Sequence, residues 1–529
     1  MSETNGLGRP ANRTELTPVS FLERSALVYP DRIAVVHEDR RHTYRELAGR
    51  VNRLASALWR AGLDKGDRVA FLSPNTPALL EAHYGVPLAG GVLVALNYRL
   101  NARDLAQILE HAGARFLFVD HEYEHLVAGA AVPRIVRIDD SGAPDDPYEA
   151  FLATGAPEPL PGVLADEAEP IAINYTSGTT GRPKGAVYHH RGAYLNALGE
   201  VIETRLTSES VYLWTLPMFH CNGWCFTWAV TAVGGCHVCL RRVEPGRIWE
   251  LIDAEGVTHY CGAPTVQAAL LDHPQAHVLD REVVTVVSGS PPSREQFARL
   301  TALGFRPIHV YGATELYGPY LICEPQAAWK ALPSDAQAAL LARQGVQYPV
   351  ADPVRVVDDG GRDVPADGTT LGEVLMRGNT VMTGYFRDPE QTEETLAGGW
   401  YHSGDLAVRH PDGYIELRDR KKDIIISGGE NISTIEVEDA IRQHPAVAAV
   451  AVVSTPDEKW GERPKAFVEL APGERASAEE ILAFARERLP GYMRPDTLEF
   501  AELARTATGK IRKQPLRDRE WAGRKRKVA

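Results

Sequence analysis

The chain has 529 residues, of which 57 are Lys or Arg and 70 are Asp or Glu, so its formal net charge at pH 7 is −13. This charge argues against non-specific binding to nucleic acid or to an anionic membrane, because both need a basic face. The composition, 44% hydrophobic and 24% charged, is that of a globular enzyme, and the length predicts several domains. No apolar run reaches the roughly 18 residues of a membrane helix, and the start lacks the apolar core of a secretory signal. We therefore expect a cytoplasmic protein without an integral membrane segment.

The N-terminal part of the chain alternates helical and strand-like patterns. Residues 44–62 place apolar side chains at helical spacing and end on Gly62, which is typical of a helix C-terminus. Short apolar runs at 67–73, 90–96 and 114–120 predict buried strands. Helices between such strands predict a parallel sheet built of βαβ units.

A second α/β region follows, and the pattern then changes twice. Its strand candidates are 171–177, 211–217, 237–242, 257–263, 282–290 and 306–312. From about 345 to 420 helical patterns are scarce and Gly/Asp turns frequent, which predicts a small antiparallel sheet or barrel. Beyond it, a helix at 432–445, a strand at 447–455 and a helix at 478–490 predict a compact α+β domain.

Four of the six cysteines are close in sequence, with His220 and His237 beside them: Cys221, Cys225, Cys236 and Cys239. The spacing of the last two is one that zinc sites use. However, residues 236–239 follow a glycine pair and have a strand pattern, so these two side chains would point to opposite faces of a sheet. We therefore expect reduced, buried thiols rather than a zinc site.

A polar, glycine-rich loop at residues 176–185, "TSGTTGRPKG", directly follows a predicted strand. Small residues let backbone N–H groups approach phosphate oxygens, the Thr and Ser hydroxyls add donors, and Lys184 adds positive charge. The loop is not the P-loop of nucleotide triphosphatases, because Gly185 follows the lysine where that motif needs Ser or Thr. Alone, such a loop is equally compatible with a surface turn.

Six motifs in order make the chain resemble the adenylate-forming enzymes, which include acyl-CoA synthetases, firefly luciferase and peptide-synthetase adenylation domains. They are "YTSGTTGRPKG" at 175, "LPMFHCNGW" at 216, "VYGATE" at 310, "YHSGD" at 401, "DRKKDIIISGGENI" at 419 and "TATGKIRK" at 506. The resemblance covers nearly the whole chain. The segments "PMFHCNGWCFTW" and "AHYGVPLAGGVLVALN" look most like plant acyl-activating enzymes and bacterial short- and medium-chain acyl-CoA synthetases.

The resemblance implies an α/β fold in two domains. A large N-terminal domain, residues 1–421, would hold two α/β subdomains and a small β-barrel. A small mobile α+β domain, residues 422–529, would carry the catalytic lysine. The implied reaction joins a carboxylic acid to ATP as an acyl-adenylate with release of pyrophosphate, and CoA then takes the acyl group with release of AMP. The implied ligands are thus ATP, Mg²⁺ and CoA as co-substrate, together with a small-molecule acid.

The same resemblance assigns residues that contact ATP and Mg²⁺. Tyr311 packs on adenine, Thr314 holds the α-phosphate, and Glu315 is the Mg²⁺ ligand, with Thr176 as a second metal contact. Asp405 accepts hydrogen bonds from the ribose hydroxyls, and Arg420 contacts ribose and phosphate. The β- and γ-phosphate loop and the adenine-side contacts are Thr176, Ser177, Gly178, Thr179, Thr180, Gly181 and Lys184, and Gly289, Ser290, Pro291 and Gly312.

Other assigned residues concern catalysis and domain movement. Lys510 is the principal catalytic lysine, Lys422 is the hinge, and His220 gates the acyl pocket unless it is a structural histidine. The segment that covers the site during thioester formation is Ser427, Gly428, Gly429, Glu430 and Asn431. Trp224 and Trp228, four residues apart, would share a helix face. We expect Trp228 in the core, whereas Trp224 lies either in the core or at the floor of the acyl pocket.

Three alternatives to a carboxylate–CoA ligase remain. The enzyme can pass its acyl-adenylate to an amine or to a carrier-protein thiol. It can be an inactive homologue that senses nucleotide or acid, although intact Glu315, Asp405, Arg420 and Lys510 argue against this. It can be a luciferase-like oxygenase, which would need the same first step. The sequence does not identify the acid, because a methylene is worth only about 1–3 kcal/mol in an apolar pocket. The oligomeric state is not readable either, and a homodimer is one option.

Overall fold

The computed structural model describes residues 12–160, 164–177, 183–289, 294–505 and 511–524. Its internal contacts divide the chain into two compact units. Unit 1 comprises residues 1–342, 347–353 and 377–399, and unit 2 comprises residues 343–346, 354–376 and 400–529. Among the described residues, no helix combines the length and the hydropathy needed to span a bilayer.

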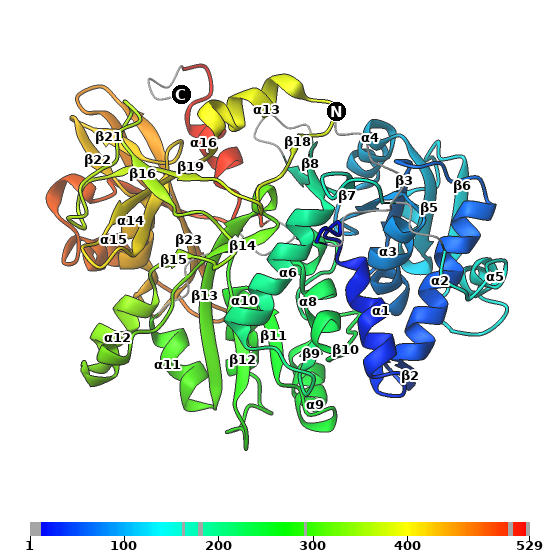
Figure 1. Ribbon diagram of the computed structural model, residues 1–529. Coiled ribbons are helices and arrows are strands. Elements are labelled where there is room, and N and C mark those ends of the chain that lie inside the picture. Colours follow the sequence, from blue (N-terminus) through cyan, green and yellow to red (C-terminus); the bar gives the residue numbers. More distant parts are fainter. Residues whose placement is uncertain (1–11, 161–163, 178–182, 290–293, 506–510, 525–529) are drawn as a thin grey trace. The chain divides into compact units, whose positions relative to one another are not determined.

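The first sheet of unit 1 has seven strands in the order β18-β8-β7-β4-β3-β5-β6 (Figure 1). The predicted βαβ strands β3 to β7 pair in parallel, whereas β8 and β18 join the edge in antiparallel orientation. Their bounds are β3 Arg68–Leu72, β4 Val92–Ala95, β5 Ala114–Asp120, β6 Arg134–Ile138, β7 Pro170–Ser177, β8 Pro183–His189 and β18 Gly384–Tyr385. Thus the predicted parallel sheet is present, and a later chain segment extends its edge.

The second sheet of unit 1 contains strands β14-β13-β12-β11-β9-β10-β1-β2 side by side. All neighbours from β1 to β13 pair in parallel, whereas β2 pairs with β1, and β14 with β13, in antiparallel orientation. Their bounds are β1 Ile33–His37, β2 Arg40–Thr43, β9 Val211–Leu213, β10 Cys236–Val238, β11 His259–Gly262, β12 Val283–Val287, β13 Phe305–Ala313 and β14 Gly318–Ile322. Of the six strands predicted between 171 and 312, five lie in this sheet and the one at 171–177 is β7 of the first sheet, so all six are confirmed.

Helices join the two sheets through one hydrophobic core that includes Leu54 of α2, Val69 of β3, Trp228 of α8 and Val284 of β12. Helix α2 (Tyr44–Arg60) starts with a capping box between Thr43 and Glu46 and is followed by Gly62 at φ +87°, as predicted. The other helices of unit 1 are α1 Val19–Val28, α3 Pro77–Leu88, α4 Ala102–Ala112, α5 Pro147–Ala153, α6 His190–Thr204, α7 Cys221–Trp224, α8 Phe226–Val233, α9 Pro245–Ala254, α10 Pro264–Leu271, α11 Arg294–Ala302, α12 Ser334–Leu341 and α13 Pro389–Thr395.

Unit 2 contains a four-stranded antiparallel sheet and an α+β part. The sheet has the order β16-β17-β19-β20, as its turn-rich sequence predicts. The strands are β16 Arg355–Val357, β17 Gly372–Met376, β19 Tyr401–Arg409 and β20 Ile415–Arg420. The second sheet of unit 2 has the order β22-β21-β24-β23, with β25 also paired to β24.

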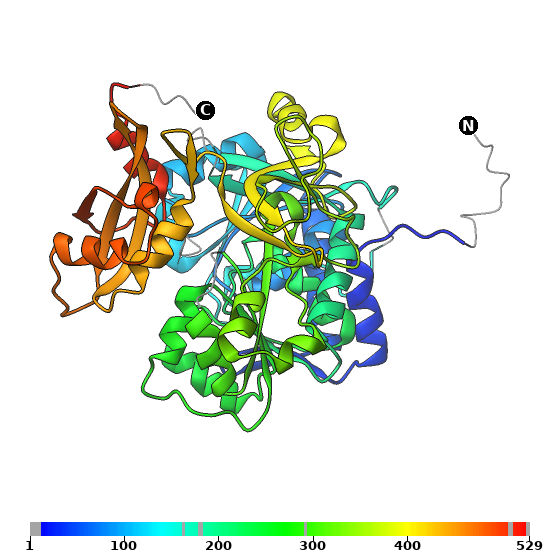
Figure 2. The ribbon, with the colours of Figure 1, turned by 90° about the vertical axis from the view of Figure 1, so that its left-hand side faces the viewer.

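The α+β part of unit 2 also follows the predicted pattern. Its elements are β21 Ile425–Ser427, β22 Glu430–Ile432, α14 Thr434–Arg442, β23 Val447–Asp457, β24 Gly461–Leu470, α15 Ala478–Arg486, β25 Thr497–Phe500 and α16 Lys513–Glu520. Helices α14 and α15 cover the sheet through a core that includes Val437, Val450, Val468 and Ile481. In Figure 2, α16 (red) lies against the sheet (orange), where it contacts β23.

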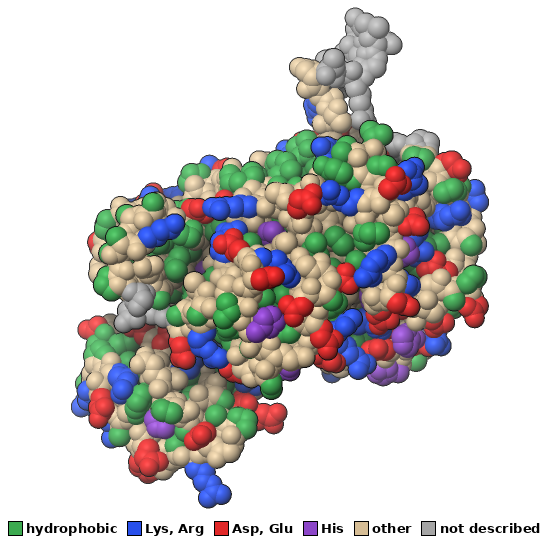
Figure 3. Space-filling view, turned by 90° about the horizontal axis from the view of Figure 1, so that it is seen from below, with side chains coloured by type: hydrophobic (Ala, Val, Ile, Leu, Met, Phe, Trp, Pro, Cys, Tyr) green, Lys and Arg blue, Asp and Glu red, His purple; other side chains and the backbone are tan. Residues whose placement is uncertain are grey.

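On the face that Figure 3 shows, acidic and basic side chains are interspersed. The electrostatic potentials of interspersed opposite charges largely cancel beyond a Debye length, which is about 8 Å at physiological salt. An anionic ligand on this face would therefore need local donors.

Candidate active site

The predicted site residues of unit 1 follow the carboxyl ends of parallel strands, where α/β sheets bind ligands. Thr176 is the second-last residue of β7, Gly289 lies two residues beyond the end of β12, and Thr314 directly follows β13. Gly289 has φ +95° and is exposed, so its backbone takes a conformation that favours glycine. Its predicted neighbours Ser290 and Pro291 lie outside the described residues.

The glycine-rich loop is the connection of a β-hairpin. Strands β7 and β8 pair in antiparallel register, which sets Thr176 opposite Lys184. The loop residues Gly178, Thr179, Thr180 and Gly181 lie outside the described part of the chain. The ammonium Nζ of Lys184 is 2.5 Å from Oε1 of Gln391 and lies 5.3 Å from the ring centroid of Tyr385.

Thr314 and Glu315 form the short 3₁₀ helix η2 (Thr314–Leu316) directly after β13. The carbonyl oxygen of Thr314 accepts a hydrogen bond of 2.5 Å from the Tyr188 hydroxyl. Oε1 of Glu315 accepts one of 2.7 Å from the Tyr385 hydroxyl, and the Glu315 carbonyl accepts the Met382 N–H at 2.8 Å. Glu315 is therefore fixed at both its backbone and its carboxylate by the segment 382–385.

Tyr311 and Gly312 lie on β13, beside the return strand β14. A Cβ atom on Gly312 would approach the carbonyl oxygen of Gly318 to 1.7 Å, so only glycine fits there. The two backbones consequently meet just before Thr314 and Glu315. Tyr311 is half-buried at this position.

His220 precedes an unusual backbone segment. Burial, with a smaller effect of Arg99, lowers the pKa of His220 to about 4, so its ring is neutral at pH 7. Its ring lies 3.9 Å from Sγ of Cys221, and this sulfur is 3.5 Å from Oγ1 of Thr314. Burial also raises the pKa of the Cys221 thiol to about 12, so the thiol stays protonated. The uncharged side chain of Cys221 thus lies between His220 and Thr314 and contacts both.

The prediction that Trp224 and Trp228 share a helix face is wrong. Residues 221–225 all have positive φ, between +51° and +64°, so the chain makes a left-handed turn before α8 begins at Phe226. Trp228 is fully buried in the core, as predicted, and its indole N–H donates to the His83 carbonyl. Trp224 is also buried in this core, against the backbone of Gly318, where a Cβ atom would be 2.9 Å from the indole.

Cys236 and Cys239 point to different sides of their sheet. Cys236 packs on the core that includes Ile248, whereas Cys239 belongs to the core that includes Val35. This agrees with the strand geometry on which the sequence-based argument rests. All six cysteines are free.

In unit 2, Asp405 and Arg420 face each other across β19 and β20. They are register partners, and Nε of Arg420 is 3.1 Å from Oδ1 of Asp405. Lys422 follows two residues later, and burial together with Arg420 lowers its pKa. A carboxylate and a guanidinium are thus placed side by side, next to the predicted hinge.

The segment 427–431 forms a tight hairpin between β21 and β22. Ser427 pairs with Glu430, so Gly428 and Gly429 are the two turn residues, at φ +61° and +93°. Positive φ at both positions is the backbone of a type I′ hairpin turn. Glu430 and Asn431 are exposed. Lys510 lies outside the described residues.

Tyr385 and Gln391 are contacts that the sequence reasoning missed. Both lie more than 200 residues from Lys184 in sequence, and no periodic pattern links such distant positions. The only local signal is a Gly-Tyr pair ahead of "DPE", which is typical of a turn before a helix.

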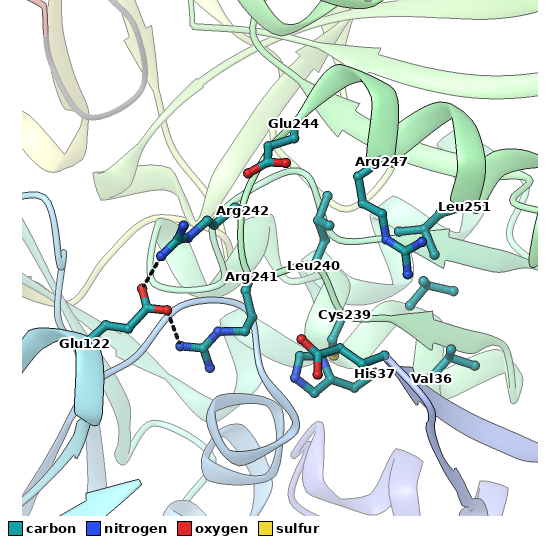
Figure 4. Close-up of a pocket in the computed structure, with 12 residues that line it drawn as sticks. Val36, His37, Glu122, Cys239, Leu240, Arg241, Arg242, Glu244, Arg247 and Leu251 are labelled. Carbon is teal, nitrogen blue, oxygen red and sulfur yellow. Dashed lines mark hydrogen bonds and ion pairs between the residues drawn. The ribbon is translucent and has the colours of Figure 1, made fainter. Parts of the chain in front are cut away.

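Unit 1 has a pocket of about 290 Å³, away from the predicted site residues, whose lining includes Arg241, Arg242 and Arg247 (Figure 4). Nη1 and Nη2 of Arg241 bind Asp120 and Asp140, and both Arg241 and Arg242 pair with Glu122. The pocket's arginines are thus matched by carboxylates, which disfavours an anionic ligand there.

Comparison with known proteins identifies the family of the chain. A family model described as AMP-binding enzyme matches residues 22–386, and one described as AMP-binding enzyme C-terminal domain matches residues 436–510. The chain is 45% identical over 540 residues to an acetate/butyrate–CoA ligase of Arabidopsis thaliana named as peroxisomal, covering 96% of this chain and 95% of that one. It is 44% identical over 521 residues to a 4-hydroxybutyrate–CoA ligase of Metallosphaera sedula, covering 95% and 94%.

A similar solved structure is the o-succinylbenzoate CoA synthetase of Bacillus subtilis in complex with its acyl-adenylate intermediate. It is 27% identical, has a TM-score of 0.83, and the match covers 96% of this chain and 99% of that one. The order of motifs, the fold and these relatives agree. The chain therefore belongs to the adenylate-forming, AMP-binding enzymes and is an AMP-forming carboxylate–CoA ligase, an acid–thiol ligase.

Proposed function

We propose that this ligase activates a short- or medium-chain acid, or an aryl acid, with ATP and Mg²⁺, and transfers the acyl group to CoA. The relatives named for acetate, butyrate and 4-hydroxybutyrate support a short chain. The observation that carries the site assignment is one connected set of contacts in unit 1. It joins Thr176 and Lys184 on the hairpin to Thr314 and Glu315 after β13.

The residues of this set suit a carboxylate that attacks the α-phosphate of a polyanion. Lys184 and the hairpin donors would hold the β- and γ-phosphates, and the Thr314 hydroxyl the α-phosphate. Such preorganised donors and in-line positioning supply most of the catalysis in phosphate chemistry. Neutral His220, beside Cys221 and Thr314, would border the acid without adding charge.

The donors at Glu315 fit Mg²⁺. The side chain supplies a hard carboxylate, and the Tyr385 hydroxyl binds one of its oxygens, which orients the group for monodentate binding. Thr176 is a second oxygen donor on the facing hairpin. When bound, Mg²⁺ would neutralise charge on the phosphate oxygens.

We propose that Asp405 and Arg420 hold the ribose and that Lys510 bridges the acid and the α-phosphate.

We further propose that residues 1–421 and 422–529 are the two moving domains, with the hinge at Lys422. One arrangement would bring Lys510 to the phosphates, and the other the hairpin 427–431. The separate family matches to residues 22–386 and 436–510 support this division. A cytoplasmic location remains our proposal from the sequence.

The test is ATP-dependent pyrophosphate release across a panel of aliphatic and aryl acids, each with and without CoA. We expect one class of acid to release pyrophosphate, CoA to raise turnover, and acyl-CoA and AMP to accumulate. Pyrophosphate release that CoA neither accelerates nor captures would point to an amine or a carrier-protein thiol as acceptor. Binding of ATP without pyrophosphate release from any acid would contradict the proposal.

A further inference from the structure

Tyr385 contacts both Glu315 and Lys184, two residues of opposite charge that are both proposed to bind ATP and its metal ion. Its hydroxyl donates to Oε1 of Glu315 over 2.7 Å, and its ring faces the Lys184 ammonium, with Nζ 5.3 Å from the centroid. A single side chain thus contacts both the phosphate-binding lysine and the metal-binding carboxylate. Lys184 belongs to the first sheet of unit 1, whereas Glu315 follows a strand of the second.

The backbone around Tyr385 is fixed on both sides. The N–H of Phe386 donates to the Gly185 carbonyl at 2.7 Å, and that of Thr383 donates to Val187 at 2.9 Å, so β18 is paired along β8. On the other side, the Met382 N–H donates to the Glu315 carbonyl at 2.8 Å. Tyr385 is consequently placed by main-chain bonds to both of the segments that its side chain touches.

A second side chain completes the support of Lys184. Oε1 of Gln391, in α13, accepts from Nζ at 2.5 Å, and its Nε2 donates to Glu394 at 2.7 Å. The Asp388 carboxylate caps the same helix by accepting the Gln391 N–H at 3.2 Å. The ammonium is therefore held by an amide oxygen and an aromatic face, neither of which carries a charge that would cancel its own.

The Tyr385 hydroxyl is the donor in its bond to Glu315, because a carboxylate oxygen only accepts hydrogen bonds. A donor to one carboxylate oxygen lowers the freedom of Glu315 to rotate or to bind a cation through both oxygens.

We propose that Tyr385 is a positioning residue that sets Glu315 and Lys184 in a fixed relation, so that Mg²⁺ and the terminal phosphates of ATP bind together. The inference rests on the proposed roles of those two residues. It separates the two contacts of Tyr385: the hydroxyl acts on the metal side and the ring acts on the phosphate side. Tyr385→Phe removes the first contact alone, and Tyr385→Leu removes both.

The experiment is calorimetric measurement of ATP binding to the full chain without acid, once in Mg²⁺ and once in EDTA. We expect Tyr385→Phe to weaken binding about tenfold in Mg²⁺ and less than about twofold in EDTA, because a hydrogen bond to a charged group is lost only on the metal side. Tyr385→Leu and Gln391→Leu should weaken binding under both conditions, since each removes a support of Lys184.

A matched control is Tyr148→Phe. Its hydroxyl also donates to a carboxylate, Oε2 of Glu81, over 2.7 Å and in the same unit. This variant loses an equivalent Tyr–Glu hydrogen bond away from the predicted site, so its ATP affinity should be unchanged under both conditions. A similar loss in Tyr148→Phe would assign the effect to general destabilisation and overturn the inference.

Two further outcomes separate this inference from the proposed function. If the wild-type chain binds ATP equally in Mg²⁺ and EDTA, or if Glu315→Gln keeps the Mg²⁺ effect, the metal role of Glu315 fails. If those two proteins behave as proposed while Tyr385→Phe binds like the wild type, or weakens equally in both conditions, the role of Tyr385 alone is wrong.

Discussion

Lys513 is a buried structural lysine, although it lies only three residues after the predicted catalytic lysine. Its Nζ is 2.7 Å from Oε1 of Glu438 and 2.6 Å from Oγ1 of Thr434. Burial alone would lower the pKa of Lys513, but the carboxylates of Glu438 and Asp419 raise it above its usual value. Lys513 is thus committed to the interior of unit 2, which agrees with assigning catalysis to Lys510.

Removing one member of this buried pair should destabilise unit 2. In Lys513→Met the Glu438 side chain, 6% exposed, keeps its place without a cationic partner. We expect a loss of about 3–5 kcal/mol in the free energy of unfolding, measured by urea denaturation. The double variant Lys513→Met/Glu438→Gln should recover part of this loss, because the unpaired charge is gone. No recovery would mean that the ion pair is not the cause.

Lys510 should be needed in one half-reaction only. We expect Lys510→Ala to lower adenylation by about 10²–10³-fold, the usual effect of deleting an electrostatic stabiliser of the transition state. Thioester formation from supplied acyl-adenylate and CoA should stay within a few fold, because this step needs no charge at the α-phosphate. Single-turnover assays of each half-reaction separate the two. Equal losses in both would assign Lys510 a different role.

At the scale of elements, the left-handed turn 221–225 is a strained segment beside Thr314. Left-handed backbone costs about 1–2 kcal/mol per residue for side chains other than glycine. Asn174 on β7 supports the turn by donating from Nδ2 to Oδ1 of Asn222 at 2.7 Å. Strain held by neighbouring structure is common at functional sites, and here the turn places Cys221 beside Thr314 and Trp224 on Gly318.

Gly223 should be the least replaceable residue of this turn. It has φ +61°, and a Cβ atom there would lie 2.5 Å from the Trp214 ring. We expect Gly223→Ala to lower the free energy of unfolding by about 2–5 kcal/mol through backbone strain plus overpacking. Gly256→Ala is the control, because Gly256 has φ +65° with no atom within 4 Å and should cost only the strain, about 1–2 kcal/mol. Equal losses in urea unfolding would exclude the steric contribution.

A set of hydrogen bonds joins the residues before the predicted hinge, 418–419, to those after it, 433–434. Thr434 donates both its N–H and its hydroxyl to Oδ2 of Asp419, at 2.5 and 2.7 Å. Ser433 also donates to the Arg418 carbonyl at 2.6 Å. The end of β20 is thereby fastened to the first turn of α14, around the segment that contains Lys422.

For the whole molecule, a hinge at Lys422 predicts that the two half-reactions respond differently to a stiffer backbone at this residue. Proline at 422 would fix φ near −65° and resist the backbone change that a domain rotation requires. We expect Lys422→Pro to leave adenylation within a few fold and to slow thioester formation about tenfold or more. The two half-reactions are measured separately, with Lys421→Pro as the neighbouring control. Normal acyl-CoA turnover in Lys422→Pro would show that the hinge is elsewhere.

The stability of unit 1 should fall on acidification. Burial lowers the pKa of five histidines to about 4 and that of a sixth to about 3: His83, His189, His190, His220 and His259, and His237. Between pH 6.5 and 4 the unfolded chain therefore binds protons that the folded chain does not, and each such histidine contributes up to about 1.4 kcal/mol per pH unit.

Two buried carboxyl groups act in the opposite direction. Burial raises the pKa of Glu203 to about 7 and that of Glu200 well above its usual value, so both favour the folded state as the pH falls. Six histidines outweigh two carboxyl groups, so the urea midpoint should be lower at pH 5 than at pH 7. An equal or higher midpoint at pH 5 would contradict this balance.

Most of the fold follows from local patterns in the sequence. The strands at 67–73, 90–96 and 114–120 and the helix at 44–62 are all confirmed, because alternation, helical spacing and a terminal glycine are visible within a few residues. The helix face predicted for Trp224 and Trp228 failed, because tertiary contacts stabilise a left-handed turn at 221–225. These contacts are packing against Gly318 and Trp214 and the hydrogen bond from Asn174. Local propensity favours the ordinary right-handed helix there.

The sequence by itself determined the family, the reaction class and the order of the site residues, because six motifs carry their chemistry in contiguous stretches. Only the tertiary structure decided which side chains support those residues. Tyr385 reaches Glu315 and Gln391 reaches Lys184 across 70 and 207 positions of the chain. Such contacts come from pairing β18 with β8 and from the course of segment 382–385 past Glu315. The physical reason is that motif chemistry is local in sequence, whereas the positioning of that chemistry depends on how distant segments pack.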